Sequence, residues 1–127
     1  GETLSSTLAW IARIVRRQGV GVHLFDEEGA HEPLPETPDS HPAYLAVASA
    51  VTDTFPDALV TPFLVTSTTD SRWYADLSDA VLRFTPMHLQ GDDLSRVHGA
   101  NERLRIDNYL EMIHFYERCL RRTCWDE

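Results

Sequence analysis

The spacing of apolar residues along the chain predicts four helices. The first is expected to begin after Thr3, a residue that suits the N-cap position, and the second near Pro42, because proline is favoured in a first helical turn. A short helix is expected over 70–77, and a longer one from Ile106 to Leu120. The apolar positions that define the three longer faces recur mostly three or four residues apart: Leu4, Leu8, Ile11 and Val15; Tyr44, Leu45, Ala48, Val51 and Phe55; Ile106, Tyr109, Leu110, Ile113 and Leu120.

Three shorter apolar runs predict β-strands. Residues 20–24 alternate between apolar and other side chains, as in a half-buried strand. Residues 59–65 form a continuous apolar run in which Pro62 indicates an edge strand or a bulge, and Val81 to Phe84 form the third. Alternation of these strands with the helices predicts an α/β fold.

Two stretches without apolar periodicity divide these elements. Residues 26–40 hold three prolines and many acids, which indicates a linker. Residues 85–105 predict a long loop, and loops of that length in compact domains are usually functional or disordered. The helix and strand before the linker have too few residues to bury both of their faces alone.

Composition restricts the class of protein. A chain of 127 residues with 43% hydrophobic residues is long enough for one domain at most. Its net charge of −9 argues against a nucleic-acid partner, which needs a basic surface. No apolar run approaches the roughly 18 residues of a membrane span, so no membrane partner is expected. Cys119 and Cys124 are read as ordinary thiols and do not indicate a compartment.

Two short motifs carry candidate chemistry. Thr69-Asp70-Ser71-Arg72 offers a guanidinium, whose planar fork suits a substrate carboxylate. Val97-His98-Gly99-Ala100-Asn101-Glu102 offers an imidazole, which in its neutral form suits zinc. A catalytic zinc needs about three protein ligands, so His98 alone does not make a site.

Each of these residues also has an ordinary structural interpretation. Arg72 is positioned to form a salt bridge with Asp70 or with Asp76 on the same short helix. Asp70 could serve to orient Arg72 or to cap the helix. His98 could be a loop histidine hydrogen-bonded to a neighbouring acid, and Glu102 a solvated carboxylate.

In combination the motifs resemble the C-terminal part of the di-zinc aminoacylase/carboxypeptidase family of metallopeptidases. The resemblance is strongest to the carboxypeptidase S-like branch, and the wider family includes carboxypeptidase G, aminoacylase and succinyl-diaminopimelate desuccinylase. The segments that carry it are, in chain order, Gly1-Glu2-Thr3 with the helix and strand that end at Phe25, Thr69-Asp70-Ser71-Arg72, Arg83-Phe84-Thr85-Pro86, His98-Gly99-Ala100-Asn101-Glu102-Arg103, and the helix with Asn108-Tyr109.

The resemblance implies a domain organisation. Residues 1–25 would be the last helix and strand of a ferredoxin-like lid, which in family members is often a dimerisation domain and would offer a route to a homodimer. Residues 26–40 would be the linker, and residues 41–127 the C-terminal portion of a zinc-binding α/β catalytic domain.

The resemblance also implies a function. The complete enzyme would use two zinc ions to cleave small peptides or N-acyl amino acids that carry a free carboxylate. His98 would be one metal ligand, Arg72 would hold the carboxylate with Asp70 beside it, and Glu102 would orient His98 or its loop. The chain contains no His-x-Asp motif and no suitable Glu-Glu pair, so no catalytic residue is assigned in it and the chain alone is expected to be inactive. The alternative is a non-catalytic α/β interaction module.

Overall fold

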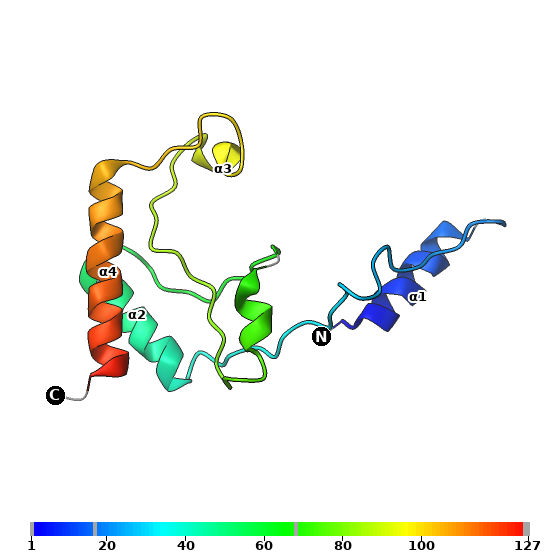
Figure 1. The fold of residues 1–127 in the computed structure, drawn as a ribbon, viewed down its shortest axis with the longest axis horizontal. Coiled ribbons are helices and arrows are strands. Elements are labelled where there is room, and N and C mark those ends of the chain that lie inside the picture. The colour runs from blue at the N-terminus through cyan, green and yellow to red at the C-terminus, as the bar shows by residue number, and fades with distance from the viewer. Residues whose placement is uncertain (1, 17, 68, 126–127) are drawn as a thin grey trace. The chain divides into compact units, whose positions relative to one another are not determined.

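The computed structural model describes residues 2–16, 18–67 and 69–125 (Figure 1). Its elements are α1 (Leu4–Val15), α2 (Pro42–Thr54), the 3-10 helix η1 (Asp70–Tyr74), α3 (Asp93–Arg96) and α4 (Ile106–Cys124). Gly1, where the family resemblance begins, lies outside the described residues. The chain divides into two units, Gly1–Pro35 and Glu36–Glu127, and the division falls inside the stretch from 26 to 40 that the sequence indicates as a linker.

The predicted α/β fold class is wrong, because the described residues form helices and no β-strand. The segments 20–24, 59–65 and 81–84 are irregular, and a strand requires a neighbour with which to exchange backbone hydrogen bonds. None of the three segments has such a neighbour among the described residues. The sheets implied for the catalytic domain and for the lid are therefore absent from the described part of the chain.

Side chains bind the backbone groups that a sheet ladder would use. The Thr37 hydroxyl accepts the N–H of Val81 at 3.1 Å and donates to its carbonyl oxygen at 3.4 Å. The Arg83 guanidinium donates to the carbonyl oxygens of Val65 (3.4 Å) and Ser67 (3.2 Å). Within the second unit, the segments 59–65 and 81–84 are thus held by side-chain contacts.

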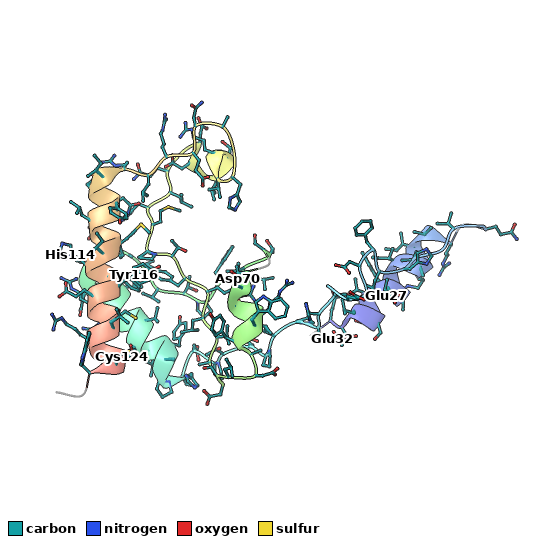
Figure 2. All side chains as sticks on the ribbon, viewed as in Figure 1. Glu27, Glu32, Asp70, His114, Tyr116 and Cys124 are labelled. Carbon is teal, nitrogen blue, oxygen red and sulfur yellow. The ribbon has the colours of Figure 1, made fainter. Side chains whose placement is uncertain are left out.

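Helix α1 begins as the sequence predicts. The Thr3 hydroxyl accepts the Ser6 N–H at 3.1 Å, and the Ser6 hydroxyl accepts the Thr3 N–H at 2.8 Å, which together form a capping box. The Glu32 carboxylate accepts the Leu4 N–H at 2.9 Å and satisfies a further free donor of the first turn (Figure 2). No α1 side chain is buried.

Helices α2 and α4 pack side by side and hold the core of the second unit (Figure 1). The buried apolar side chains are Ala50 and Val51 from α2 and Phe115 from α4. The predicted second helix is confirmed with Pro42 in its first turn, and its N-cap is His41, whose Nδ1 accepts the Ala43 N–H at 3.1 Å.

Helix α4 is confirmed, but the face predicted to pack is wrong. The side chains turned toward the unit follow one stripe at intervals of four, three and four residues: Asn108, Met112, Phe115 and Cys119. The predicted apolar face of Ile106, Tyr109, Leu110, Ile113 and Leu120 is exposed, Ile106 to 81%. The helix therefore has a second apolar face that the described residues leave uncovered.

The irregular run from Leu59 to Val65 is also apolar and open to solvent. Leu59 is 95% exposed and Phe63 is 89% exposed. Adjacent apolar residues that remain exposed on a protein surface commonly mark a place of contact with another protein surface. None of the described helices combines the length and the apolar character that crossing a membrane would demand.

We expect Phe115→Ala to lower the free energy of unfolding of the second unit by about 3–5 kcal/mol, because it empties the centre of the core. Leu110→Ala is the matched control on the exposed face of α4, and it should change that free energy by less than about 1 kcal/mol. Urea unfolding followed by circular dichroism measures both. A larger loss for Leu110→Ala than for Phe115→Ala would mean that the other face of α4 is the packed one.

Candidate functional site

The first candidate group, Arg72, lies on η1. The Thr69 hydroxyl caps this 3-10 helix by accepting the Ser71 N–H at 3.3 Å. The Arg72 guanidinium carbon lies 4.5 Å from the centre of the Trp73 ring, a cation–π arrangement that limits where the guanidinium can point. A short helix is confirmed here, although it spans only Asp70–Tyr74 and is of the 3-10 type.

Neither acid on or near η1 pairs with Arg72. Asp70 is exposed at the start of η1 (Figure 2), and Asp76 is exposed just beyond its end. Among the described residues the ion pairs of arginine lie elsewhere, so the salt bridge offered as the ordinary interpretation of Arg72 is not formed. The cap of η1 is Thr69 rather than Asp70. The guanidinium is half-buried and its hydrogen-bonding edge is not used by a carboxylate of the described chain.

The second candidate group, His98, lies on a turn that follows α3. The Gly99 N–H donates to the Arg96 carbonyl oxygen at 2.8 Å, and His98 itself has a left-handed backbone with φ of 60°. A Cβ atom at Gly99 would lie 3.3 Å from the Arg96 carbonyl oxygen, a tight contact that glycine avoids. The His98 side chain is exposed, so the turn presents the imidazole to solvent.

Glu102 does not contact His98. Its side chain is exposed, and within the described chain it forms no hydrogen bond or ion pair with the imidazole. Asn101, which stands between them, also has a left-handed backbone with φ of 60°. Glu102 therefore has the surroundings of a solvated acid in this structure.

The described residues do not bring three metal ligands together. No group of three histidine, cysteine, aspartate or glutamate side chains in this part of the chain is arranged to hold a metal ion. His98 fits the role of a single ligand, since its ring is accessible and its nitrogens have no partner among the described side chains. A complete zinc site would need ligands in addition to those that this part of the chain supplies.

The structure also does not bring Arg72 and His98 together. Of the described elements only α2 and α4 pack against each other. In Figure 1, α3, which precedes His98, lies apart from the green helical segment η1. Arg72 and His98 therefore lie at separate places in the second unit.

A polar pocket that the sequence did not predict lies at the start of α4. Its volume is about 210 Å³, and its lining residues are His88, Gln90, Asp93, Arg105, Asp107, Asn108 and Glu111. The Arg105 guanidinium is hydrogen-bonded to Asp107 and lowers the pKa of that carboxyl from its ordinary value to about 2. Asn108 is the buried polar residue of this group, and its position seven residues before Phe115 is a sequence signal for the packed face of α4.

The remaining histidines have structural or surface positions. His41 caps α2, and His88 packs edge-on against Phe55 with ring centres 4.9 Å apart. His23 and His114 are exposed, His114 on α4 (Figure 2). Among the described residues of the second unit, His41, His88 and His114 form no hydrogen bond, ion pair or ring contact with His98.

The chain is similar to curated proteins of two related kinds. It is 36% identical over 92 residues to probable carboxypeptidase S-like 2 of Dictyostelium discoideum, covering 72% of this chain and 18% of that protein. It is 37% identical over 117 residues to an N-fatty-acyl-amino acid synthase/hydrolase of Danio rerio, covering 91% and 22%, and 30% identical over 118 residues to that of Homo sapiens, covering 91% and 23%.

The chain spans about a fifth of the length of the curated relatives it matches. No family model matches it, and no solved structure is significantly similar to it. The relatives nevertheless agree with each other in kind, since they are carboxypeptidase S-like proteins and N-fatty-acyl-amino acid synthase/hydrolases. The chain therefore belongs to the aminoacylase/carboxypeptidase family of metallopeptidases, in the branch of the carboxypeptidase S-like proteins and the N-fatty-acyl-amino acid hydrolases.

Proposed function

We propose that this chain acts as part of a zinc-dependent hydrolase that cleaves the amide bond of N-acyl amino acids or small peptides with a free carboxylate. The observation that carries the proposal is the similarity to N-fatty-acyl-amino acid synthase/hydrolases over about nine-tenths of the chain. The accessible positions of Arg72 and His98 support it. Asp70, exposed two residues before Arg72, is proposed to face the same substrate.

Arg72 is proposed to hold the carboxylate of the substrate. A guanidinium can donate two parallel hydrogen bonds to a carboxylate, which fixes both its position and its orientation. Stacking on Trp73 restricts the guanidinium before the substrate arrives, so less conformational freedom is lost on binding. A carboxylate held in this way fixes where the neighbouring amide lies.

His98 is proposed to supply one ligand to zinc through a neutral ring nitrogen. The turn closed by Gly99 leaves the imidazole exposed, as a ligand shared with other residues requires. Zinc, when bound, acidifies a water molecule and polarises a carbonyl group. Glu102 is proposed to orient the His98 loop once the remaining ligands are in place.

We expect the 127-residue chain alone to show no zinc-dependent hydrolysis of an N-acyl amino acid. The described residues offer no cluster of three ligands, and one imidazole leaves most of the coordination shell to water. Calorimetric titration with zinc and an amide-cleavage assay measure the two properties. A submicromolar zinc site or zinc-dependent turnover in this chain would contradict the proposal that the site is completed by other residues.

We expect His98→Ala, in a complete hydrolase that carries this segment, to lower bound zinc and kcat together. The reason is that an incompletely liganded zinc is lost, and with it the acidified water. His114→Ala is the matched control, because His114 is exposed on α4 and away from the turn. Metal analysis and steady-state kinetics give the result, and full zinc content in the His98 variant would exclude the ligand role.

We expect Arg72→Ala in the same enzyme to retain zinc and to lower kcat/KM for substrates with a free carboxylate by about ten- to a hundredfold. This range corresponds to about 1.5–3 kcal/mol for hydrogen bonds to a charged group. A carboxamide analogue should be affected far less, since the charged half of the pair is missing. Arg13→Ala, an exposed arginine of α1, serves as the control. Equal losses of kcat/KM on acid and amide substrates would exclude the role of Arg72 in binding the carboxylate.

A further inference from the structure

We propose that Asn108 is a positioning residue that anchors the loop carrying His98, through its hydrogen bond to His88 and the local hydrogen bonds of Asp93 and Arg96 that follow along the chain. The inference rests on the proposed function only where it treats His98 as a metal ligand. The anchoring itself concerns contacts within the second unit.

Asn108 is the buried polar residue of the described chain, with 3% of its surface exposed. Its side-chain oxygen accepts the backbone N–H of His88 at 3.2 Å, and its nitrogen lies 3.5 Å from the Glu111 carboxylate. The other end of His88 is held as well, because its Nε2 lies 3.6 Å from the same carboxylate. Asn108 thus ties the start of the long loop to the first turn of α4.

Apolar contacts also hold the chain segment that leads to His88. Phe84 packs against Phe115 with ring centres 5.2 Å apart, and Pro86 is fully buried. The His88 ring packs against Phe55 at the end of α2. The chain up to His88 is therefore fastened to both core helices.

Beyond His88 the loop is held by polar contacts. The Gln90 N–H donates to Asp93 Oδ2 at 2.9 Å, and Arg96 Nη1 donates to Asp93 Oδ1 at 2.9 Å. The Arg96 carbonyl oxygen in turn accepts the Gly99 N–H at 2.8 Å, which closes the turn on which His98 stands. These three bonds share Asp93 and Arg96, and Gln90, where they begin, follows His88 by two residues.

No apolar core can replace this series. In the fully described stretch 87–107 no side chain is buried. A loop without buried side chains keeps one conformation only through its hydrogen bonds and its two ends. The other end of the loop is held where it meets α4, because Arg105 is hydrogen-bonded to Asp107. The conformation of the turn at His98 therefore depends on the anchor at His88.

The first experiment uses the 127-residue chain and requires no metal. Asn108→Ala should increase the hydrogen-exchange rate of the Gly99 amide by about tenfold or more, because the His88 N–H loses its acceptor and the loop opens. Asp93→Ala interrupts the series outside the core and should give a similar increase while the amides of α4 around Phe115 stay protected. The Asp93→Ala variant therefore still tests the proposal if the Asn108→Ala variant does not fold.

Gln90→Ala is the matched control. It removes an amide side chain from the same loop but keeps the backbone N–H that donates to Asp93. We expect it to leave the exchange rate of Gly99 unchanged. Unchanged exchange in Asp93→Ala, or an equal increase in Gln90→Ala, would overturn the anchoring.

The second experiment uses a complete hydrolase that carries this segment. Asp93→Ala should lower zinc content and kcat several-fold with little change in the KM for a carboxylate substrate, whereas a purely structural role would lower only the temperature of unfolding. Loss of loop protection with zinc content unchanged in both Asp93→Ala and His98→Ala would support the anchoring and refute the ligand role of His98. Loss of zinc in His98→Ala but not in Asp93→Ala would refute the positioning role alone.

Discussion

The packing of Phe115 between the residues of α2 is the interaction on which the second unit depends. Ala50 is small and fully buried, so the two helices approach closely at that point, and Val51 fills the space beside it. Arg122 pairs with Asp53, and Arg118 donates to the Thr54 hydroxyl at 3.1 Å. The C-terminal half of α4 therefore holds α2, while its N-terminal turn holds the loop through Asn108. One helix thus contributes both to the core and to the attachment of the long loop at His88.

Local chemistry explains which parts of this fold could be predicted from the sequence. Thr3 and Pro42 act within one turn of the helices that they begin, so α1 and α2 were predictable, as was the start of α4 at Ile106, although α4 continues to Cys124. The packed face of α4 was not. Its exposed face carries more large apolar side chains than its packed face, and counting them favoured the wrong one. Asn108 lies on the packed stripe with Phe115, but asparagine is not a typical core residue.

The prediction of β-strands was wrong because strand formation depends on residues far apart in the sequence. Alternation of Val20, Val22 and Leu24 describes one segment, whereas a ladder requires two. Val81 illustrates the difference, because its backbone groups are taken by the hydroxyl of Thr37. For the candidate site, the chemistry of Arg72 and His98 could be selected from residue type and motif. Their separation, and the bonds that hold the His98 turn, depend on partners that no local pattern encodes.

The uncovered run from Leu59 to Val65 has a consequence for the behaviour of the chain in concentrated solution. It is an uncharged segment of mostly β-forming residues, the composition that promotes assembly into intermolecular sheets. Pro62 stands at its centre and lacks an N–H, so a second chain that aligns there meets an interrupted ladder. Colloidal stability of this protein thus rests on a single imino acid within the run and on the mutual repulsion of chains that carry a charge of −9.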